Sequence, residues 1–204
     1  MRLSGYVALC VLSFGVAAYA FVAYTFAPLG SVVHPDMRAA FESNRFAIHA
    51  HIFGSLVALA LGPLQFSSRL RTRRISLHRW LGRVYLAVGV LIGGVAGLYM
   101  AVHAYGGLVA KLGFACLAVA WLYSGVSAYL AIRAGRIAEH RAWMVRNFAL
   151  TFAAVTLRIY LPSTMVAGVP FEAAYPYIAW LCWVPNLVAA ELLFNRTAQA
   201  PRRA

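Results

Sequence analysis

The stretch VYLAVGVLIGGVAGLYMAV, residues 84–102, contains no charged side chain and decides the class of this protein. An α-helix needs about 20 mostly apolar residues to cross a bilayer, so a run of this length predicts a transmembrane helix. Five further stretches share this apolar character. The six predicted spans, with flanking residues included, are 6–29, 46–66, 80–103, 109–132, 143–166 and 175–194. The short connections between them predict one all-α integral membrane domain over residues 1–204, a polytopic bundle without a soluble domain.

The composition supports the same class. Of the 204 residues, 63% are apolar and 11% are charged, whereas soluble domains have roughly 45–50% and about 25%. These proportions exclude a water-soluble enzyme, a disordered tail and a disulfide scaffold. Cys10, Cys116 and Cys182 are far apart and each lies in an apolar run, so we interpret them as small buried side chains.

The basic residues predict the orientation of the bundle. Lys and Arg number 18 against 5 Asp and Glu, and short loops rich in Lys and Arg stay on the cytoplasmic side. Fourteen of the 18 fall at the chain ends or at the connections after spans two and four, three fall on the opposite side, and Arg158 lies within span five. Both termini are therefore predicted to be cytoplasmic. One alternative stays open: Arg2 and the small residues at 18–20 loosely mimic a signal peptide, although the apolar run favours a retained helix.

Two regions outside the regular spans carry further signals. The connection 30–45 mixes both signs of charge, which predicts either a short amphipathic helix on the outer surface or a polar linker. Within span six, Pro185 and Asn186 interrupt the helical hydrogen-bond ladder. Glu191 is expected to pair with the arginines of the inner loops.

Two spans carry polar residues along one face. In span two, His51 and Gln65 share a narrow stripe, so His51 rather than His49 is the inward candidate. Span five carries four polar residues on one face: His140, Asn147, Thr151 and Arg158. Polar residues inside a membrane face the bundle interior and often mark a substrate or proton path. We expect Arg158, the only charge well inside a span, to point into the bundle or to extend outward to the interface.

Span three combines histidines with closely spaced glycines. His78 and His103 lie on one face at its two ends, and Gly89, Gly93 and Gly97 recur every four residues. Such small residues usually allow close packing of two helices. The alternative is that they give a flat cofactor or substrate access to the backbone.

Several segments resemble one known family. They read HIFG at 51–54, GPLQF at 62–66, LHRWLGRVY at 77–85 and HRAWMVR at 140–146. Over about residues 45–165 the chain is similar to bacterial multi-pass membrane proteins catalogued as domain of unknown function 2306. The resemblance implies a bacterial inner-membrane protein but assigns no reaction. It singles out these residues: His51, Gln65, His78, Arg79, His140, Arg141, Trp143 and Arg158.

The histidines also resemble, more weakly, those of the six-helix cytochrome b561 and ferric-reductase-like proteins, in which histidine pairs near both membrane faces ligate b haems. This resemblance implies haem iron held by His78 and His140, or by His51 and His103, with Arg79 and Arg141 near the propionates. The sequence departs from that pattern because span four has no histidine. In addition, His78 and His103 are about 37 Å apart by helical rise, which favours one haem over two.

Three functions stay open at this point. The protein is a b-type haem electron-transfer protein, a small transporter or lipid- or quinone-binding factor, or a structural membrane protein without a cofactor. The expected partners are the bilayer, anionic lipid headgroups at the inner arginines, and a quinone or redox partner, but no nucleic acid. The sequence has no nucleophile–base pair, HExxH motif or phosphate loop, so nothing in it supports a hydrolase.

Overall fold

The computed structural model describes residues 3–198, with side chains described to residue 192, and the regular elements in this part of the chain are all helical. In chain order the helices are α1 (Leu3–Phe26), α2 (Pro35–Ser43), α3 (Arg45–Gln65), α4 (Ser68–Arg73), α5 (Ile75–Val84), η1 (Tyr85–Ile92), α6 (Gly93–Val102), α7 (Gly107–Arg133), α8 (Ile137–Thr151), α9 (Ala153–Val166), α10 (Phe171–Leu181) and α11 (Val184–Ala198). The element η1 is a π-helical stretch that joins α5 to α6 within one continuous crossing.

In the described part of the chain, five helical segments are long and apolar enough to cross a membrane. They are Leu3–Phe26, Arg45–Gln65, Ile75–Val102, Gly107–Arg133 and Ile137–Val166. Each overlaps one of the first five predicted spans. This agreement confirms an all-helical polytopic membrane bundle.

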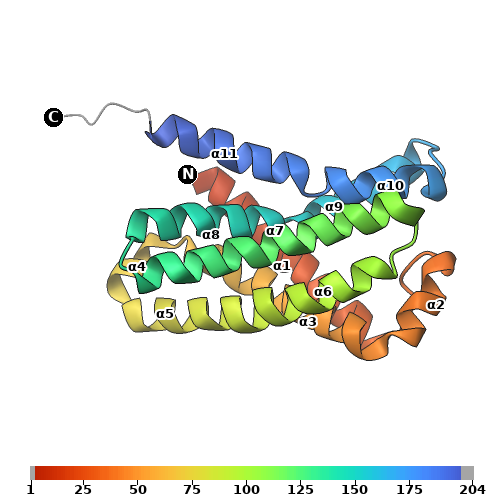
Figure 1. The fold of residues 1–204 in the computed structure, drawn as a ribbon, viewed down its shortest axis with the longest axis horizontal. Helices are drawn as coiled ribbons and strands as arrows, with labels where there is room; N and C mark the ends of the chain where they lie inside the picture. Colours follow the sequence, from red (N-terminus) through yellow and green to blue (C-terminus); the bar gives the residue numbers. More distant parts are fainter. Residues whose placement is uncertain (1–2, 199–204) are drawn as a thin grey trace.

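The sixth predicted span is interrupted. The helix ends at Leu181 and begins again at Val184, which leaves an 11-residue α10 and a 15-residue α11. Pro185 lies in the first turn of α11, where its missing N–H leaves no helical hydrogen bond unmade. The break thus falls just before the predicted Pro185–Asn186 interruption, and the two helices follow one another along the bundle (Figure 1).

The two ends of the bundle differ in charge. Figure 1 shows α4, the turn from α7 to α8, the start of α1 and the end of α11 at one end of the molecule. We call this the basic end, because α4 and the α7–α8 turn carry the clustered arginines. The opposite end, called the outer end, holds α2 and the links from α6 to α7 and from α9 to α10. The positive-inside rule predicts that this end faces the cytoplasm.

Glycines bring α3 directly against the third crossing. A Cβ added to Gly89 would lie 2.8 Å from the Ala58 Cβ, and one added to Gly54 would lie 2.8 Å from the Gly93 backbone. Real Cβ atoms do not approach neighbours this closely, so only glycine permits this helix separation. The packing interpretation of the glycine spacing is therefore confirmed at Gly89 and Gly93.

The outer connection contains a short helix. Residues 35–43 form α2, with Pro35 at its first turn and no fully buried side chain. Arg38 and Glu42 form an exposed i,i+4 ion pair at 3.1 Å on its surface. Of the two predictions for this connection, the surface helix is confirmed.

Candidate ligand-binding cavity

A buried hydrogen-bond network joins the third, fourth and fifth crossings near the middle of the bundle. It consists of Tyr85, Trp121, Ser124, Asn147 and Thr151, which we call the polar core. Asn147 Nδ2 donates to the backbone oxygen of Trp121 at 2.8 Å and to Ser124 Oγ at 2.9 Å. Asn147 Oδ1 accepts from the Tyr85 hydroxyl at 2.6 Å. Trp121 Nε1 donates to Thr151 Oγ1 at 2.9 Å.

The polar core is saturated. Both donors and the acceptor of the Asn147 amide are used, and Tyr85 and Asn147 are each 0% exposed. A fully hydrogen-bonded buried group stabilises one arrangement of the helices and has no free atom for a substrate. Asn147 and Thr151 thus face inward, as predicted for span five, but their side chains hold helices together.

The inner histidines lie at the basic end. His140 Nδ1 is 2.8 Å from the backbone oxygen of Ala128, whereas His78 Nδ1 is buried without a hydrogen-bond partner in the described part of the chain. Arg79 and Arg141 are exposed on the same end. The structure therefore places the two histidines that the b561 resemblance pairs at one end of the bundle, with both arginines on its exposed surface.

Gln65 also lies at the basic end of span two. It is 7% exposed, and its Nε2 has no hydrogen-bond partner among the described residues. Its Oε1 lies beside the small Gly82 of α5, 3.3 Å from where a Cβ would stand. Gln65 therefore faces inward as predicted, but far along α3 from His51.

The outer half of the bundle contains a cavity of about 1220 Å³. It extends from Trp121 and Thr151 of the polar core, which form its inner end, to α2 and α10 at the outer end. Typical small-molecule sites measure about 300–1,000 Å³, so this space can hold a large ligand. Most lining side chains are apolar, and two of the residues singled out from the sequence, His51 and Arg158, also line it.

His51 is held in one orientation by the third crossing. Its Nδ1 lies 2.8 Å from the backbone oxygen of Gly93. Because a carbonyl oxygen only accepts, Nδ1 carries the hydrogen, which leaves Nε2 of the neutral ring as an acceptor. A Cβ on Gly97 would lie 2.6 Å from Nδ1, so Gly97 provides the space that the ring occupies. This third glycine of the spacing thus gives clearance to a side chain rather than to a cofactor.

Arg158 approaches the cavity from α9. Its Nη1 donates to the backbone oxygen of Ala154 at 2.9 Å, and its guanidinium carbon lies 5.8 Å from the centre of the Tyr19 ring. None of the ion pairs found in the described residues includes Arg158. Most of its donors are therefore available to a ligand. Counted along the helices, His51 lies about 9 Å and Arg158 about 12 Å from the outer ends of α3 and α9.

His103 lines the same cavity but at another level. It caps the end of α6, six residues beyond Gly97, and its ring packs against Tyr99 at 5.0 Å. Six residues of helix rise about 9 Å, so the two outer histidines do not face each other. The cavity contains both members of the predicted outer haem pair without the opposed arrangement that two axial ligands require.

Sequence reasoning missed two parts of this cavity. The first is α1, whose Tyr19 and Tyr24 line it, although their span showed no polar stripe. The second is the outer mouth, where His34 and Asp36 lie near Glu172 of α10. The scarcity of acidic residues in the chain was the available signal, because unpaired carboxylates stand out in so basic a protein.

Comparison with known proteins agrees with this architecture. No curated protein and no solved structure matches the chain. The model of one family, described as predicted membrane protein (DUF2306), matches residues 48–194. This match runs from α3 into α11 and includes His51, His78, His103, His140 and Arg158, whereas His34 and α2 precede it. The chain therefore belongs to the DUF2306 family of predicted membrane proteins.

Proposed function

We propose that this protein binds one isoprenoid quinone, in its quinol or semiquinone form, in the outer half of the bundle, within the bacterial inner membrane. The observation that carries the proposal is the cavity of about 1220 Å³, mainly apolar, with His51 and Arg158 in its lining. Pockets of this kind bind ligands that are largely apolar and are oriented by a few polar groups. The isoprenoid tail of such a ligand fits the apolar lining, and the ring of the ligand supplies the polar groups.

The hydrogen-bonding roles of His51 and Arg158 determine which kind of ring the cavity can bind. His51 Nε2 is an acceptor, so the ligand atom opposite it must donate a hydrogen. Arg158 is a donor, so the atom opposite it must accept. A quinol or semiquinone ring presents hydroxyl and oxygen groups at its two sides and satisfies both. The phosphodiester group of a lipid has only acceptors, so a phospholipid would satisfy His51 only through a hydroxyl or ammonium group elsewhere in its headgroup.

A b-type haem is the second candidate. A histidine that ligates a metal usually donates its other ring nitrogen to a carbonyl, and His51 makes this contact with Gly93. The second axial ligand is the difficulty, because His103 lies at another level of α6. Haem would supply one-electron chemistry, and the reduced visible spectrum of the purified protein distinguishes it from a quinone.

The arginines of the basic end support a further part of the proposal. Arg69, Arg73 and Arg74 are exposed around α4, and Trp80 of α5 is 58% exposed beside them. An exposed tryptophan beside arginines is typical of the membrane interface. We infer that these arginines and Trp80 contact anionic lipid headgroups and orient the bundle in the membrane.

The test is extraction of the detergent-purified protein with organic solvent, followed by quantification of quinones and phospholipids. We expect about one quinone per chain in the unaltered protein. A hydrogen bond to a charged group contributes about 1.5–3 kcal/mol, so Arg158→Gln should lower quinone retention by about 10-fold or more. Quinone that is absent, or equally abundant in Arg158→Gln, would overturn the proposal.

The matched control is Arg45→Gln. Arg45 is an exposed arginine at the outer end of α3, six residues before His51. It removes the same charge from the same side of the membrane without touching the cavity lining. Quinone retention in this variant should equal that of the unaltered protein. An equal loss in both variants would show a general charge effect and contradict a site at Arg158.

A further inference from the structure

The five carboxylates of the chain are distributed unevenly. Three of them each pair with an arginine: Glu42 with Arg38, Glu139 with Arg136 and Glu191 with Arg146. The other two are Asp36 and Glu172. Within the described residues neither pairs with an arginine or lysine, although the chain carries a net charge of +13.

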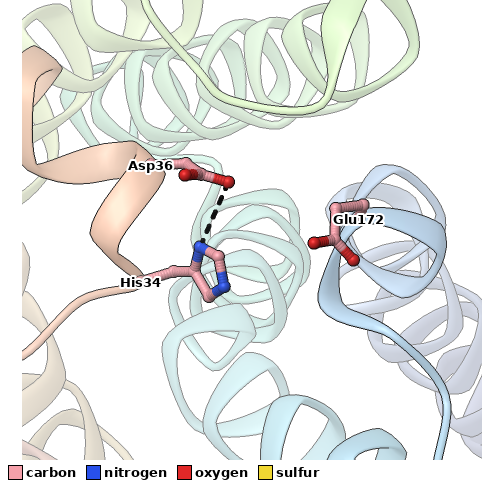
Figure 2. A group of neighbouring side chains, drawn as sticks. All are labelled: His34, Asp36 and Glu172. Carbon is pink, nitrogen blue, oxygen red and sulfur yellow. Dashed lines mark ion pairs between the residues drawn. The ribbon is translucent and has the colours of Figure 1, made fainter.

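These two carboxylates meet at the mouth of the cavity together with a histidine. His34 and Asp36 come from the start of α2, and Glu172 comes from the first turn of α10 (Figure 2). One potential ligand atom from each of the three lies within 4.8 Å of the other two. The residues are separated by more than 130 positions in the chain, so the fold itself creates this cluster.

The orientation of the His34 ring is fixed by its neighbours. The ring stacks on Phe171 with centroids 4.0 Å apart and an interplanar angle of 7°, which fixes the plane of the imidazole. Its buried Nδ1 forms an ion pair with Asp36 Oδ2 at 3.6 Å, a contact too long for a hydrogen bond (Figure 2). A buried nitrogen without a hydrogen bond is better satisfied by a closer ligand.

We propose that His34, Asp36 and Glu172 form a binding site for one divalent transition-metal ion of the Zn²⁺ class. Two carboxylates held close together repel each other, and a cation between them removes that repulsion. One nitrogen and two oxygen donors suit Zn²⁺ and leave a fourth position for water. Tetrahedral Zn²⁺ places its ligand atoms about 3.4 Å apart, so closing the site requires a movement of little more than 1 Å.

A neighbouring tyrosine supports the histidine. Tyr105, in the link between α6 and α7, packs near the His34 ring at 6.3 Å and near the Phe171 ring at 5.5 Å, centroid to centroid. These aromatic contacts help to hold the imidazole in place beside the two carboxylates.

The proposed ion connects two elements across the outer end of the cavity. His34 and Asp36 line the cavity, and so do Tyr105 and Phe171. Metal binding would therefore fasten α2 to α10 and hold the mouth closed. The proposed metal site is formed by these three side chains alone, so it does not depend on what the cavity binds.

The test is titration of the untagged, EDTA-treated and lipid-stripped protein with Zn²⁺ in an isothermal calorimeter. We expect one Zn²⁺ per chain and a higher thermal midpoint in its presence, because a ligand that binds only the folded state stabilises it. His34→Asn and Glu172→Gln should each weaken binding by about 100-fold. Thermal midpoints measured without metal show whether both variants fold.

The control is Glu42→Gln, which removes a carboxylate from the same helix but outside the cluster. It should bind Zn²⁺ as the unaltered protein does. Absence of binding to the unaltered protein, equal binding by Glu172→Gln, or equal loss in Glu42→Gln would each overturn the proposal. Because bound lipid is stripped first, these outcomes are independent of the quinone measurement.

Discussion

The middle and the outer half of this bundle use polar residues in opposite ways. Around Asn147 each polar atom has a partner inside the protein, and the Asn147 and Tyr85 side chains are fully buried. Around Arg158, half a helix further on, the fold leaves a cavity of about 1220 Å³. Both residues lie on the same predicted face of span five. The difference teaches that a polar intramembrane residue suggests a binding role only where its hydrogen bonds remain available.

The largest expected effect comes from breaking the polar core. Asn147→Leu leaves the Tyr85 hydroxyl, Ser124 and the Trp121 carbonyl without their amide partner. Buried groups left unsatisfied each cost about 1–3 kcal/mol, and hydrogen bonds between membrane helices average about 0.6 kcal/mol. We therefore expect the free energy of unfolding in detergent to fall by about 2–3 kcal/mol. Ser163→Ala, at an exposed hydroxyl, is the control and should be nearly neutral.

Quinone retention in whatever fraction of Asn147→Leu stays folded should match the unaltered protein. Folding can be followed by circular dichroism and quinone by solvent extraction of the same sample. If the variant remains fully stable yet loses its quinone, the polar core belongs to the binding site and the distinction between the two halves is wrong.

The second prediction concerns the glycine that makes room for His51. Gly97→Val places side-chain atoms where the imidazole lies, because even a Cβ would stand 2.6 Å from Nδ1. Overpacking of this kind costs about 1–3 kcal/mol of stability, and displacing His51 removes the acceptor for the ligand. Quinone retention should fall by about 10-fold. Ala87→Val is the control, since Ala87 is exposed on the same crossing and does not belong to the cavity lining.

The third prediction separates charge from geometry at Arg158. Lysine keeps the positive charge but lacks the planar fork of the guanidinium. Arg158→Lys should retain quinone better than Arg158→Gln but worse than arginine, with the unfolding free energy changed by less than about 1 kcal/mol. Competition titrations with a short-chain quinone, read from tryptophan fluorescence, give the order. Equal affinity for all three proteins would remove Arg158 from the site.

The smallest expected effect concerns the ion pair that ties α8 to α11. Arg146 Nε and Nη2 donate to the two carboxylate oxygens of Glu191 at 2.5 and 2.8 Å, and both side chains are partly exposed. Partly exposed pairs contribute up to about 1 kcal/mol, so Glu191→Gln should lower the unfolding free energy by no more than this. The more exposed pair of Glu139 should contribute still less. A larger loss in Glu139→Gln than in Glu191→Gln would contradict this order.

The sequence predicts the parts of the fold that depend on local composition. Apolar runs predicted the first five crossings, and the arginines predicted that α1 begins and α11 ends at the same end of the bundle, because span length and charge bias are properties of short segments. The pairing of Glu191 with an inner arginine followed from its position near the end of span six, on the side of the basic connections. The inward direction of Asn147 and Thr151 followed from helical periodicity.

The site depends on relations between distant segments, and these were beyond reach. Periodicity placed Asn147 and Arg158 on one face but could not show that one is enclosed and the other borders a cavity. His51 and His103 resembled a ligand pair because both lie near the outer surface. Their different levels become visible only once α3 is packed on the third crossing, where His51 lies beside Gly97 and His103 is six residues further along. The meeting of Asp36 with Glu172 likewise requires α2 and α10 to be brought to the same end.

Native mass spectrometry of the protein released gently from detergent tests the central claim most directly. We predict one adduct per chain with the mass of an isoprenoid quinone in the unaltered protein and in Arg45→Gln, and its loss in Arg158→Gln. A bare chain under conditions that preserve the fold, or an adduct that survives Arg158→Gln unchanged, would contradict a ligand site in the outer half of the bundle.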